Sequence, residues 1–377
     1  MPTNISNEKR YSIFIFLSMF SKGMAEIFIP VVLYNKGFNL SLIFLYFSIK
    51  YLVIIITYYL VVELAKIIRF KVLLVLSAIM LGISFYLLTT MGSSISNLLI
   101  AATLFALYTE TYWAGRHYYA LEVIPSKNLS CEVGNIIIAG EIGLIPSAYL
   151  GGLAIELLGL KYLTIIITLI ALISIIPLLK IKEFKDKEPI NASIILKEIP
   201  KKSMLYLIFD QFKYLTVLFF PLYLYLNVVE NYRYIGIVNV AIGIASMIFV
   251  YLFAKKMDKN KKDYLSLGTI CLALVLVFKL NITNPLVMIV IGLFEGLATK
   301  MQMTSVIRNI YALGQHYNTI SYLIVIELIQ NIGRFIILGY ALLFINNLIE
   351  FLAMCIFLFS LASVLEFNTN KNSEQLF

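Results

Sequence analysis

Charged side chains inside long apolar stretches are the residues of this sequence best suited to chemistry. A charge at the centre of a membrane helix costs about 2.5–3.5 kcal/mol on insertion scales, and such groups usually mark ion or substrate pathways. Eleven side chains belong to this class: Lys22, Glu26, Lys50, Glu110, Glu141, Asp210, Lys213, Glu295, Lys300, Glu327 and Arg334. We take them as candidates for binding a substrate or a proton.

The spacing of these residues predicts that several share a helix face. Lys22 and Glu26 are four residues apart and therefore lie on one face of a helix. Asp210 and Lys213, three residues apart, do the same later in the chain. Two longer polar stripes consist of Glu327, Gln330, Asn331 and Arg334, and of Glu295, Thr299 and Gln302.

The eleven groups comprise six acids and five bases, so the interior is nearly neutral. Ion pairing among them makes charges tolerable in a membrane, and this structural role is the alternative for each group. The surplus acid points to function, because a carboxylate withdrawn from water binds a proton more readily. The acids considered for proton binding are Glu26, Glu110, Glu141 and Glu327. Glu141 and Glu26 lead, since Glu141 has no base within one helical turn and Glu26 can share Lys22.

The elements that must position these charges are membrane helices. Hydrophobic residues make up 61% of the 377-residue chain and charged residues 14%, whereas a soluble domain has about 25% charged residues. This composition excludes a soluble protein and a disordered one. A membrane helix needs about 20 mostly apolar residues, and runs of this length exclude β-barrel strands. Twelve predicted spans cover residues 11–34, 40–62, 72–90, 97–119, 134–157, 160–179, 203–226, 232–253, 264–280, 284–307, 319–345 and 347–366.

The distribution of lysine and arginine predicts the orientation of the spans. With the N-terminus inside, the inner segments hold 21 of the 30 bases and the outer segments hold 4, including Lys279. This asymmetry predicts that both termini are cytoplasmic and that the number of spans is even. It also accounts for the net charge of +9 without a nucleic-acid partner.

The chain is expected to divide into two halves of six spans each. The N-terminal bundle is predicted at residues 1–179, the cytoplasmic linker at 180–202 and the C-terminal bundle at 203–377. Residues 190–199 of the linker can form a short interfacial helix. The sequence Arg-x-x-Tyr-Ala-Leu occurs at 116–121, at the end of span four, and again at 308–313, at the end of span ten. Such a repeat suits a transporter whose binding site lies between the halves.

The three cysteines predict neither a disulfide framework nor a metal site. Cys131, Cys271 and Cys355 are far apart and lie in apolar or loop contexts. We expect no metal and no cofactor. The first apolar stretch is too long for a cleavable signal peptide and is expected to remain as the first span.

The segment after span eight resembles a cytoplasmic loop motif of the major facilitator superfamily, Gly-x-x-x-Asp-Arg-x-Gly-Arg-Arg. Asp258, Lys259 and Lys262 match the acid and the bases, whereas Ala254 and Lys261 replace the glycines. The copy after span two, at 62–71, keeps only bases. The resemblance implies a gating role for this loop, which bridges neighbouring helices on the inner face.

Span five is similar to the antiporter motif of the same family, Gly-x8-Gly-x3-Gly-Pro-x2-Gly-Gly. The matching glycines are Gly134, Gly143, Gly151 and Gly152. Ser147 and Ala148 replace the Gly-Pro pair. The resemblance, which extends to drug/proton antiporter-type exporters, implies close packing of span five on a neighbour. The alternative is a helix contact with no bearing on the direction of transport.

The distribution of the charges over the spans also agrees with the family. Spans three, six, nine and twelve carry none of the eleven charges. The resemblance implies that these four spans are outermost and face lipid, whereas the other eight line a central cavity.

These observations predict an all-α protein of twelve helices in two pseudo-symmetric bundles. The expected function is secondary active transport of a small solute across the cytoplasmic membrane by alternating access. The expected direction is export, coupled to protons. Uptake by proton symport and a transporter-like receptor or accessory protein without transport are the alternatives. We expect a monomer in the lipid bilayer. No enzyme is expected, because the chain lacks His-Glu-x-x-His, clustered aspartates, Gly-x-Ser-x-Gly and a phosphate-binding loop. The mixed interior charges favour neither a cationic nor an anionic substrate.

Overall fold

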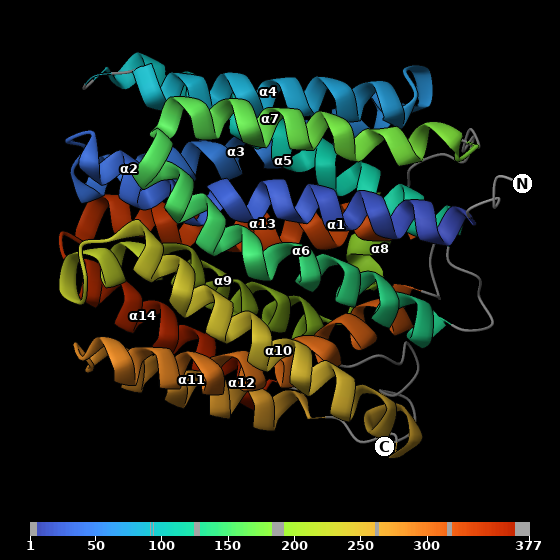
Figure 1. Ribbon diagram of the computed structural model, residues 1–377. Coiled ribbons are helices and arrows are strands. Elements are labelled where there is room, and N and C mark those ends of the chain that lie inside the picture. The colour runs from blue at the N-terminus through green and yellow to red at the C-terminus, as the bar shows by residue number, and fades with distance from the viewer. Residues whose placement is uncertain are drawn as a thin grey trace, which may run out of the picture.

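The computed structural model describes residues 6–90, 92, 94–123, 129–182, 192–260, 264–314 and 319–365. All regular secondary structure in these ranges is helical. The long helices run side by side along one common direction (Figure 1). This arrangement places every long helix in contact with others of its kind and leaves the loops at the two ends of the bundle.

The first half of the chain consists of six long helical stretches, two of which are continued by 3₁₀ segments. In order they are α1 (Asn7–Ala25), η1 (Glu26–Phe28), α2 (Ile29–Asn35), α3 (Leu40–Ile67), α4 (Phe70–Thr90), α5 (Ile95–Val123), α6 (Leu129–Leu158), α7 (Leu160–Ile175) and η3 (Ile176–Lys180). Side-chain caps define two starts: Ser6 accepts from the amide of Lys9, and Asn39 accepts from the amide of Leu42.

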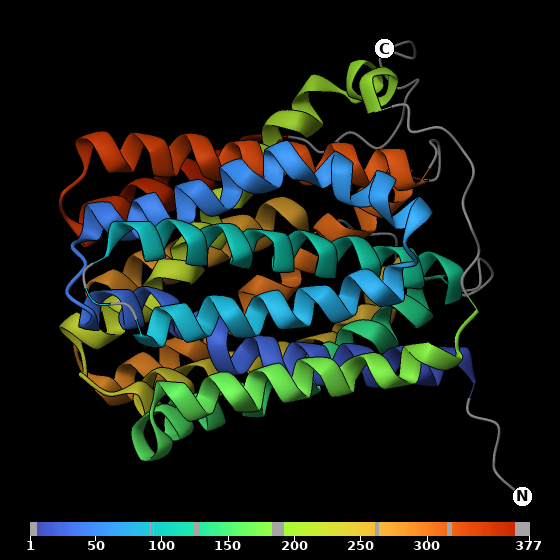
Figure 2. The ribbon, with the colours of Figure 1, turned by 90° about the horizontal axis from the view of Figure 1, so that it is seen from above.

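The second half begins with a short helix and continues with six long stretches. They are α8 (Ala192–Glu198), α9 (Lys201–Asn227), α10 (Tyr232–Asn260), α11 (Leu265–Leu280), α12 (Pro285–Gly314), α13 (Thr319–Phe344), α14 (Leu348–Leu361) and η4 (Ala362–Val364). The short α8 falls within the stretch 190–199 that we expected to be helical, and it lies beside the main bundle rather than inside it (Figure 2).

Nine helical stretches of the described chain are long and apolar enough to cross a membrane. The stretches α11 and α14–η4 are apolar but shorter. The remaining long helix, α5, is not among the nine. Helical segments cover each of the twelve predicted spans, but the number of crossings beyond nine stays a prediction.

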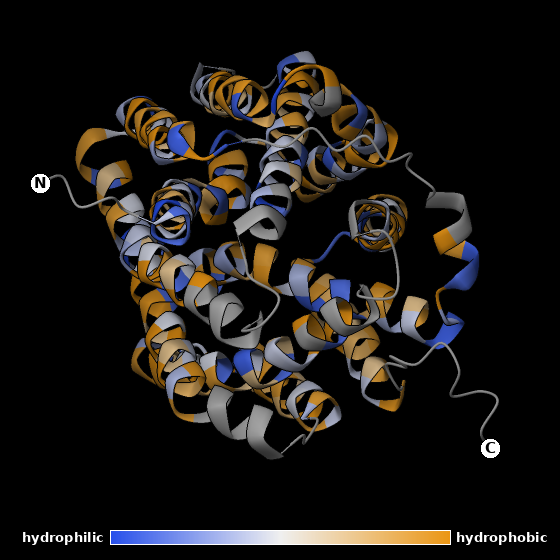
Figure 3. Ribbon diagram, turned by 90° about the vertical axis from the view of Figure 1, so that its right-hand side faces the viewer, coloured by the Kyte–Doolittle hydropathy of each residue, from blue (hydrophilic) through white to orange (hydrophobic). Residues whose placement is uncertain are grey.

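The surface of the bundle is apolar and its interior holds charges, the reverse of a soluble protein. Leu157, Leu286 and Leu343 are each about two-thirds or more exposed, whereas Lys50 is fully buried and Glu110 is 1% exposed. Viewed along the helices, apolar residues (orange) dominate the ribbons (Figure 3). This distribution suits lipid around the bundle and explains why the buried charges require partners.

In the described part of the chain, several helix contacts connect the first half to the second. The helix α6 packs against α1 of its own half and against α10 of the other half, and α3 packs in the same way against α5 and α13. At one end of the bundle, η1 and α2 also contact α9. Charged residues on α3, α6 and α13 are therefore close to the boundary between the halves.

Candidate functional site

Glu26 lies between two lysines at a break in the first helical stretch. The α-helix gives way to a 3₁₀ turn at Glu26–Phe28, and Pro30 follows within the next turn. The Glu26 carboxylate accepts from Lys22 Nζ at 3.2 Å and from Lys50 Nζ at 3.4 Å. The i,i+4 pair predicted from spacing is therefore present, and Lys50 of α3 joins it. Lys50 Nζ also lies 4.4 Å from the ring centroid of Phe105, a cation–π distance.

Glu110, near the middle of α5, is a buried acid that forms no ion pair with a described base. Its Oε2 atom lies 2.7 Å from Thr57 Oγ1 of α3, and Oε1 has no hydrogen-bond partner among the described residues. Thr57 Oγ1 is also 2.7 Å from the carbonyl oxygen of Val53. A hydroxyl has one proton to donate. Thr57 can donate it to an ionised Glu110, or donate it to Val53 and accept from a protonated Glu110.

Glu141 of α6 is paired, contrary to the expectation that it lacks a base. Lys300 Nζ of α12 lies 2.5 Å from Glu141 Oε1. The expectation was wrong because it considered only bases on the same helix, and Lys300 comes from the other half of the chain. Both side chains are largely buried, which strengthens their attraction relative to a pair in water.

Glu327 of α13 also has its partner across the boundary between the halves. His117 Nε2 of α5 lies 3.8 Å from Glu327 Oε1. The amide nitrogen of Asn331 lies 2.7 Å from the Glu327 carbonyl oxygen and 3.4 Å from its carboxylate. The His117 ring in turn stacks on the indole of Trp113 with centroids 5.8 Å apart. A titratable imidazole and a carboxylate therefore meet inside the bundle.

Arg334, two turns beyond Glu327 on α13, interacts with neutral groups. Its guanidinium donates to the side-chain oxygen of Gln211 at 3.0 Å and 2.6 Å and to that of Asn331 at 3.1 Å. The Tyr214 ring centroid lies 4.2 Å from its Cζ atom. No carboxylate of a described residue forms an ion pair with Arg334, so its charge is solvated by amides and an aromatic face. The polar stripe predicted on this helix contains Asn331, but it did not predict Gln211, which comes from α9.

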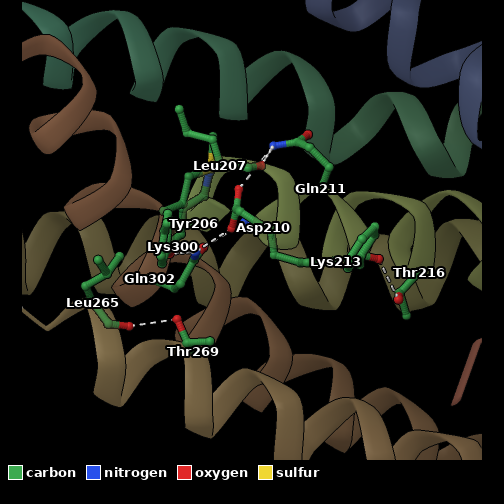
Figure 4. Close-up of polar contacts among 12 residues, drawn as sticks. Tyr206, Leu207, Asp210, Gln211, Lys213, Thr216, Leu265, Thr269, Lys300 and Gln302 are labelled. Atoms are coloured by element: carbon green, nitrogen blue, oxygen red, sulfur yellow. Dashed lines mark hydrogen bonds and ion pairs between the residues drawn. The ribbon is translucent and has the colours of Figure 1, made fainter. Parts of the chain in front are cut away.

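A hydrogen-bond network on α9 and α12 surrounds Asp210. Lys213 Nζ donates to Asp210 Oδ1 at 2.8 Å and to Gln302 Oε1 at 2.7 Å. The Gln302 amide nitrogen lies 2.6 Å from Asp210 Oδ1 and 2.8 Å from the Tyr206 hydroxyl. These side chains point toward one another between the two helices (Figure 4). The i,i+3 pair predicted from spacing is present, and Gln302 of α12 hydrogen-bonds to both of its members.

Glu295 of α12 pairs with Lys279 at the end of α11. We expected Lys279 in an outer segment, but Lys279 is 2% exposed and forms an ion pair with Glu295. Lys279 Nζ also lies 3.8 Å from the ring centroid of Phe220. The sequence placed Lys279 at a span end, and only packing of α11 on α12 shows that it points inward.

A comparison with protein families decides what kind of protein carries these charges. The model of the Major Facilitator Superfamily matches residues 11–338. The chain belongs to the major facilitator superfamily. Members of this family are generally transporters, and with its apolar helices the chain is a multi-pass membrane protein. A search of curated proteins found no match to it.

The glycines that resemble the family's antiporter motif lie where α6 meets other helices. A Cβ atom on Gly143 or Gly151 would overlap the carbonyl oxygens of Phe16 and Met24 on α1, respectively. A Cβ on Gly152 would lie 2.5 Å from the carbonyl oxygen of Tyr232 on α10. The structure thus has the close helix packing that the motif implies. Gly134 is in α6, but its surroundings lie outside the described part.

The family's cytoplasmic loop motif falls at the end of α10. Asp258 and Lys259 belong to this helix, but their side chains are outside the described residues, and Lys262 is outside the described ranges altogether. The gating role of these three residues stays a prediction.

No group of three or more histidine, cysteine, aspartate or glutamate side chains that could hold a metal occurs in the described part of this superfamily member. Cys271 and Cys355 are free thiols, and Cys131 has no described side chain. What the geometry brings together is a set of charged residues near the boundary between the halves. Sequence spacing missed Thr57 and Gln211 beside these charges, and it missed Lys279 as the partner of Glu295.

Proposed function

We propose that this superfamily member is a secondary transporter that exports a small solute in exchange for protons. In this proposal twelve spans form two bundles, residues 1–179 and 203–377, in the cytoplasmic membrane, and both termini are cytoplasmic. The two bundles alternate between facing the inside and facing the outside around a site at their boundary. The chain acts as a monomer and needs no cofactor.

The observation that carries the proposal is the environment of Glu110. This buried carboxylate forms no ion pair with a described base, and Thr57 can hydrogen-bond its ionised and its protonated form. Desolvation disfavours a lone carboxylate charge, so Glu110 is suited to take up a proton and release it as its surroundings change. Structural acids of this chain have lysine partners instead, as Glu141, Asp210 and Glu295 do.

The ion pairs between the halves support alternating access. Glu141–Lys300 and His117–Glu327 each join helices from different halves. Movement of one bundle relative to the other separates such partners, and water or a bound solute must then solvate them. Their free energy therefore depends on the conformation, as a transport cycle requires.

Export is the direction favoured by the packing of α6. The glycines that resemble the antiporter motif place α6 against α1 and α10 at backbone distance. The sequence resemblance associates this packing with exporters. Uptake by symport is the alternative direction, and the transport assay described next distinguishes the two.

The test is an unbiased transport assay in sealed vesicles. Purified protein is reconstituted, the vesicles are loaded with a small-molecule fraction of cell extract, and a pH gradient is imposed in each direction. Mass spectrometry should find at least one solute that moves opposite to the proton flow in wild-type vesicles. Glu110→Gln should abolish this gradient-driven movement, whereas Glu350→Gln, at an exposed site on α14, should not.

Other outcomes contradict specific parts of the proposal. A solute that moves with the protons establishes symport and refutes export. Transport coupled through Glu110 is refuted by two results together. No solute moves with the pH gradient, and the infrared absorption of protonated carboxyl groups is the same in wild type and Glu110→Gln.

The orientation in the membrane needs a separate test. Single cysteines at Ser94 and Lys259 are probed on intact cells with an impermeant thiol reagent. Labelling at 259 but not at 94 would reverse the topology.

A further inference from the structure

Three bases gather around the centre of the bundle and outnumber the carboxylates that balance them. Lys22 and Lys50 share the single carboxylate of Glu26. Arg334 forms no ion pair with a described carboxylate and donates only to Gln211 and Asn331. This part of the interior therefore has an excess of positive charge, although the eleven membrane charges are nearly balanced as a set.

The three bases come from both halves of the chain, and two of them, Lys50 and Arg334, meet at Tyr51. Lys50 Nζ lies 5.2 Å from the centroid of the Tyr51 ring, and Arg334 Cζ lies 5.4 Å from the same centroid. The charge of Lys50 interacts with those of Lys22 and Arg334, both of which repel it. Since α3 belongs to the first half and α13 to the second, this repulsion acts across the boundary between them.

Other charged groups near the three bases do not remove the excess. Glu327, the acid of α13, interacts electrostatically with Arg334, and His117 and Asn331 bind its carboxylate. The three bases still outnumber the two acids Glu26 and Glu327. The acid of α5, Glu110, hydrogen-bonds to Thr57 and forms no ion pair with any of the three bases.

We propose that Lys22, Lys50 and Arg334 bind the anionic group of the transported solute, a small organic anion such as a carboxylate. The proposal rests on the transport function proposed above and names its substrate class. An anion here replaces the neutral amide oxygens as acceptor for Arg334, and charge-assisted bonds to a guanidinium are about twice as strong as neutral ones. By contacting Lys50 and Arg334 together it bridges the two halves.

The groups around the bases suit an organic anion better than a bare ion. The aromatic rings of Trp113, Tyr51 and Tyr214 lie beside Lys22, Lys50 and Arg334 and provide flat apolar surface for the body of the solute. The Tyr51 hydroxyl is buried near Tyr214, and it makes no hydrogen bond of standard geometry to a described residue. It is thus a further donor for an anionic oxygen.

The chain contains an internal probe for this site. Trp113 is its single tryptophan, and Lys22 Nζ lies 4.8 Å from its ring centroid. Arg116 Cζ also lies 4.7 Å from this centroid, so only variants of the three bases separate their effect from that of Arg116. Quenching of its fluorescence by iodide reports local anion concentration, quenching by caesium reports cations, and quenching by acrylamide reports access alone. The measurement uses detergent-purified protein at constant ionic strength, and each quenching constant is divided by the constant of the same quencher for free tryptophan. The normalised constant should be larger for iodide than for caesium.

Variants assign the effect to the three bases. Arg334→Gln should lower the iodide quenching constant about twofold or more relative to acrylamide, because a site lined by one sign of charge concentrates counter-ions. Arg334→Lys should retain it, and Lys161→Gln, at an exposed lysine on α7, should not change it. If Arg334→Gln does not fold, Lys22→Gln provides the same test. Equal quenching by iodide and caesium, or no response to either Gln variant, would overturn the anion site.

Competition tests the organic class of the anion. Benzoate should protect Trp113 from iodide, whereas the matched neutral compound benzamide should protect it less. Equal protection by the two compounds would refute an organic carboxylate as the occupant. The assay uses neither a gradient nor transport, so it separates this proposal from the previous one. A proton-coupled transporter of cations fails it, whereas a protein that binds anions without proton coupling passes.

Discussion

Glu141 and Lys300, separated by 159 residues, form an ion pair of 2.5 Å that joins α6 to α12 across the two halves of the chain. The pair between His117 and Glu327 joins α5 to α13. Spans four and ten, and spans five and eleven, are matching members of the sequence repeat. Each pair therefore connects an acid on a span of the five/eleven type with a base on a span of the four/ten type.

The Glu141–Lys300 pair should contribute to stability as a unit. Glu141→Gln leaves the largely buried Lys300 without its carboxylate, and breaking such a pair costs about 3–5 kcal/mol. The apparent melting temperature in detergent, followed by size-exclusion chromatography after heating, should fall. Glu141→Gln combined with Lys300→Gln should recover most of the loss. A double variant that is less stable than either single one would contradict this pairing.

Thr57→Val should move the pH dependence of transport upwards. The valine removes the hydroxyl that lies 2.7 Å from Glu110 Oε2. The ionised carboxylate loses a charge-assisted hydrogen bond worth about 1.5–3 kcal/mol, more than the protonated form loses. Protonation then persists to higher pH, and the half-maximal pH of gradient-driven transport should rise by about one unit. Thr103→Val, at a threonine of α5 whose hydroxyl donates to the Leu99 carbonyl, is the control. A downward movement of the profile would refute the role given to Thr57.

Alanine at Gly151 should separate α6 from α1. The new Cβ atom would overlap the backbone carbonyl of Met24, which cannot move aside as a side chain can. Overpacking of this kind costs about 1–3 kcal/mol. Gly140→Ala on the same helix is the control, because its Cβ would lie at an ordinary 3.5 Å from Ile15 Cγ2. Thermal stability should fall for the first variant and not for the second; an equal response of both would argue against a packing role specific to Gly151.

Asn35 should help to close one end of the bundle. Its amide nitrogen donates to the hydroxyls of Tyr225 at 3.0 Å and Tyr232 at 2.8 Å, which belong to the other half. Asn35→Ala removes both bonds, so the population in which α2 and α9 are separated should rise. Electron paramagnetic resonance can measure this population from the distribution of distances between spin labels attached at Tyr34 and Glu230. A distribution identical to that of the unmutated labelled protein would show that Asn35 does not hold this end closed.

The sequence predicted contacts within a helix better than contacts between helices. Spacing alone predicted the Lys22–Glu26 and Asp210–Lys213 pairs, because residues three or four apart must share a helix face. It gave the wrong surroundings for Glu141, whose partner lies on a helix of the other half. Nothing in a linear pattern specifies which faces of two distant helices meet.

The same limit applies to the substrate class. The count of six acids and five bases favoured neither a cation nor an anion. Burial and distance divide that total into local groups: Asp210 and Lys213 balance each other, whereas Lys22, Lys50 and Arg334 exceed their acids. The repeat and the apolar stretches, by contrast, were readable because they depend on residue type and order alone.

The contact between α6 and α10 has a mechanical consequence. Gly152 approaches the backbone of Tyr232, and Gly236 on α10 approaches that of Tyr149, with an added Cβ at 2.5 Å and 2.6 Å respectively. At these two points the helices touch through bare main chain, without side chains locked into each other's grooves. Tilting one helix on the other there breaks no interdigitated layer and requires no rotamer to change. The smooth contact can therefore serve as a pivot, while the resistance to movement comes from ion pairs along the boundary, including Glu156–Arg233 beside the pivot.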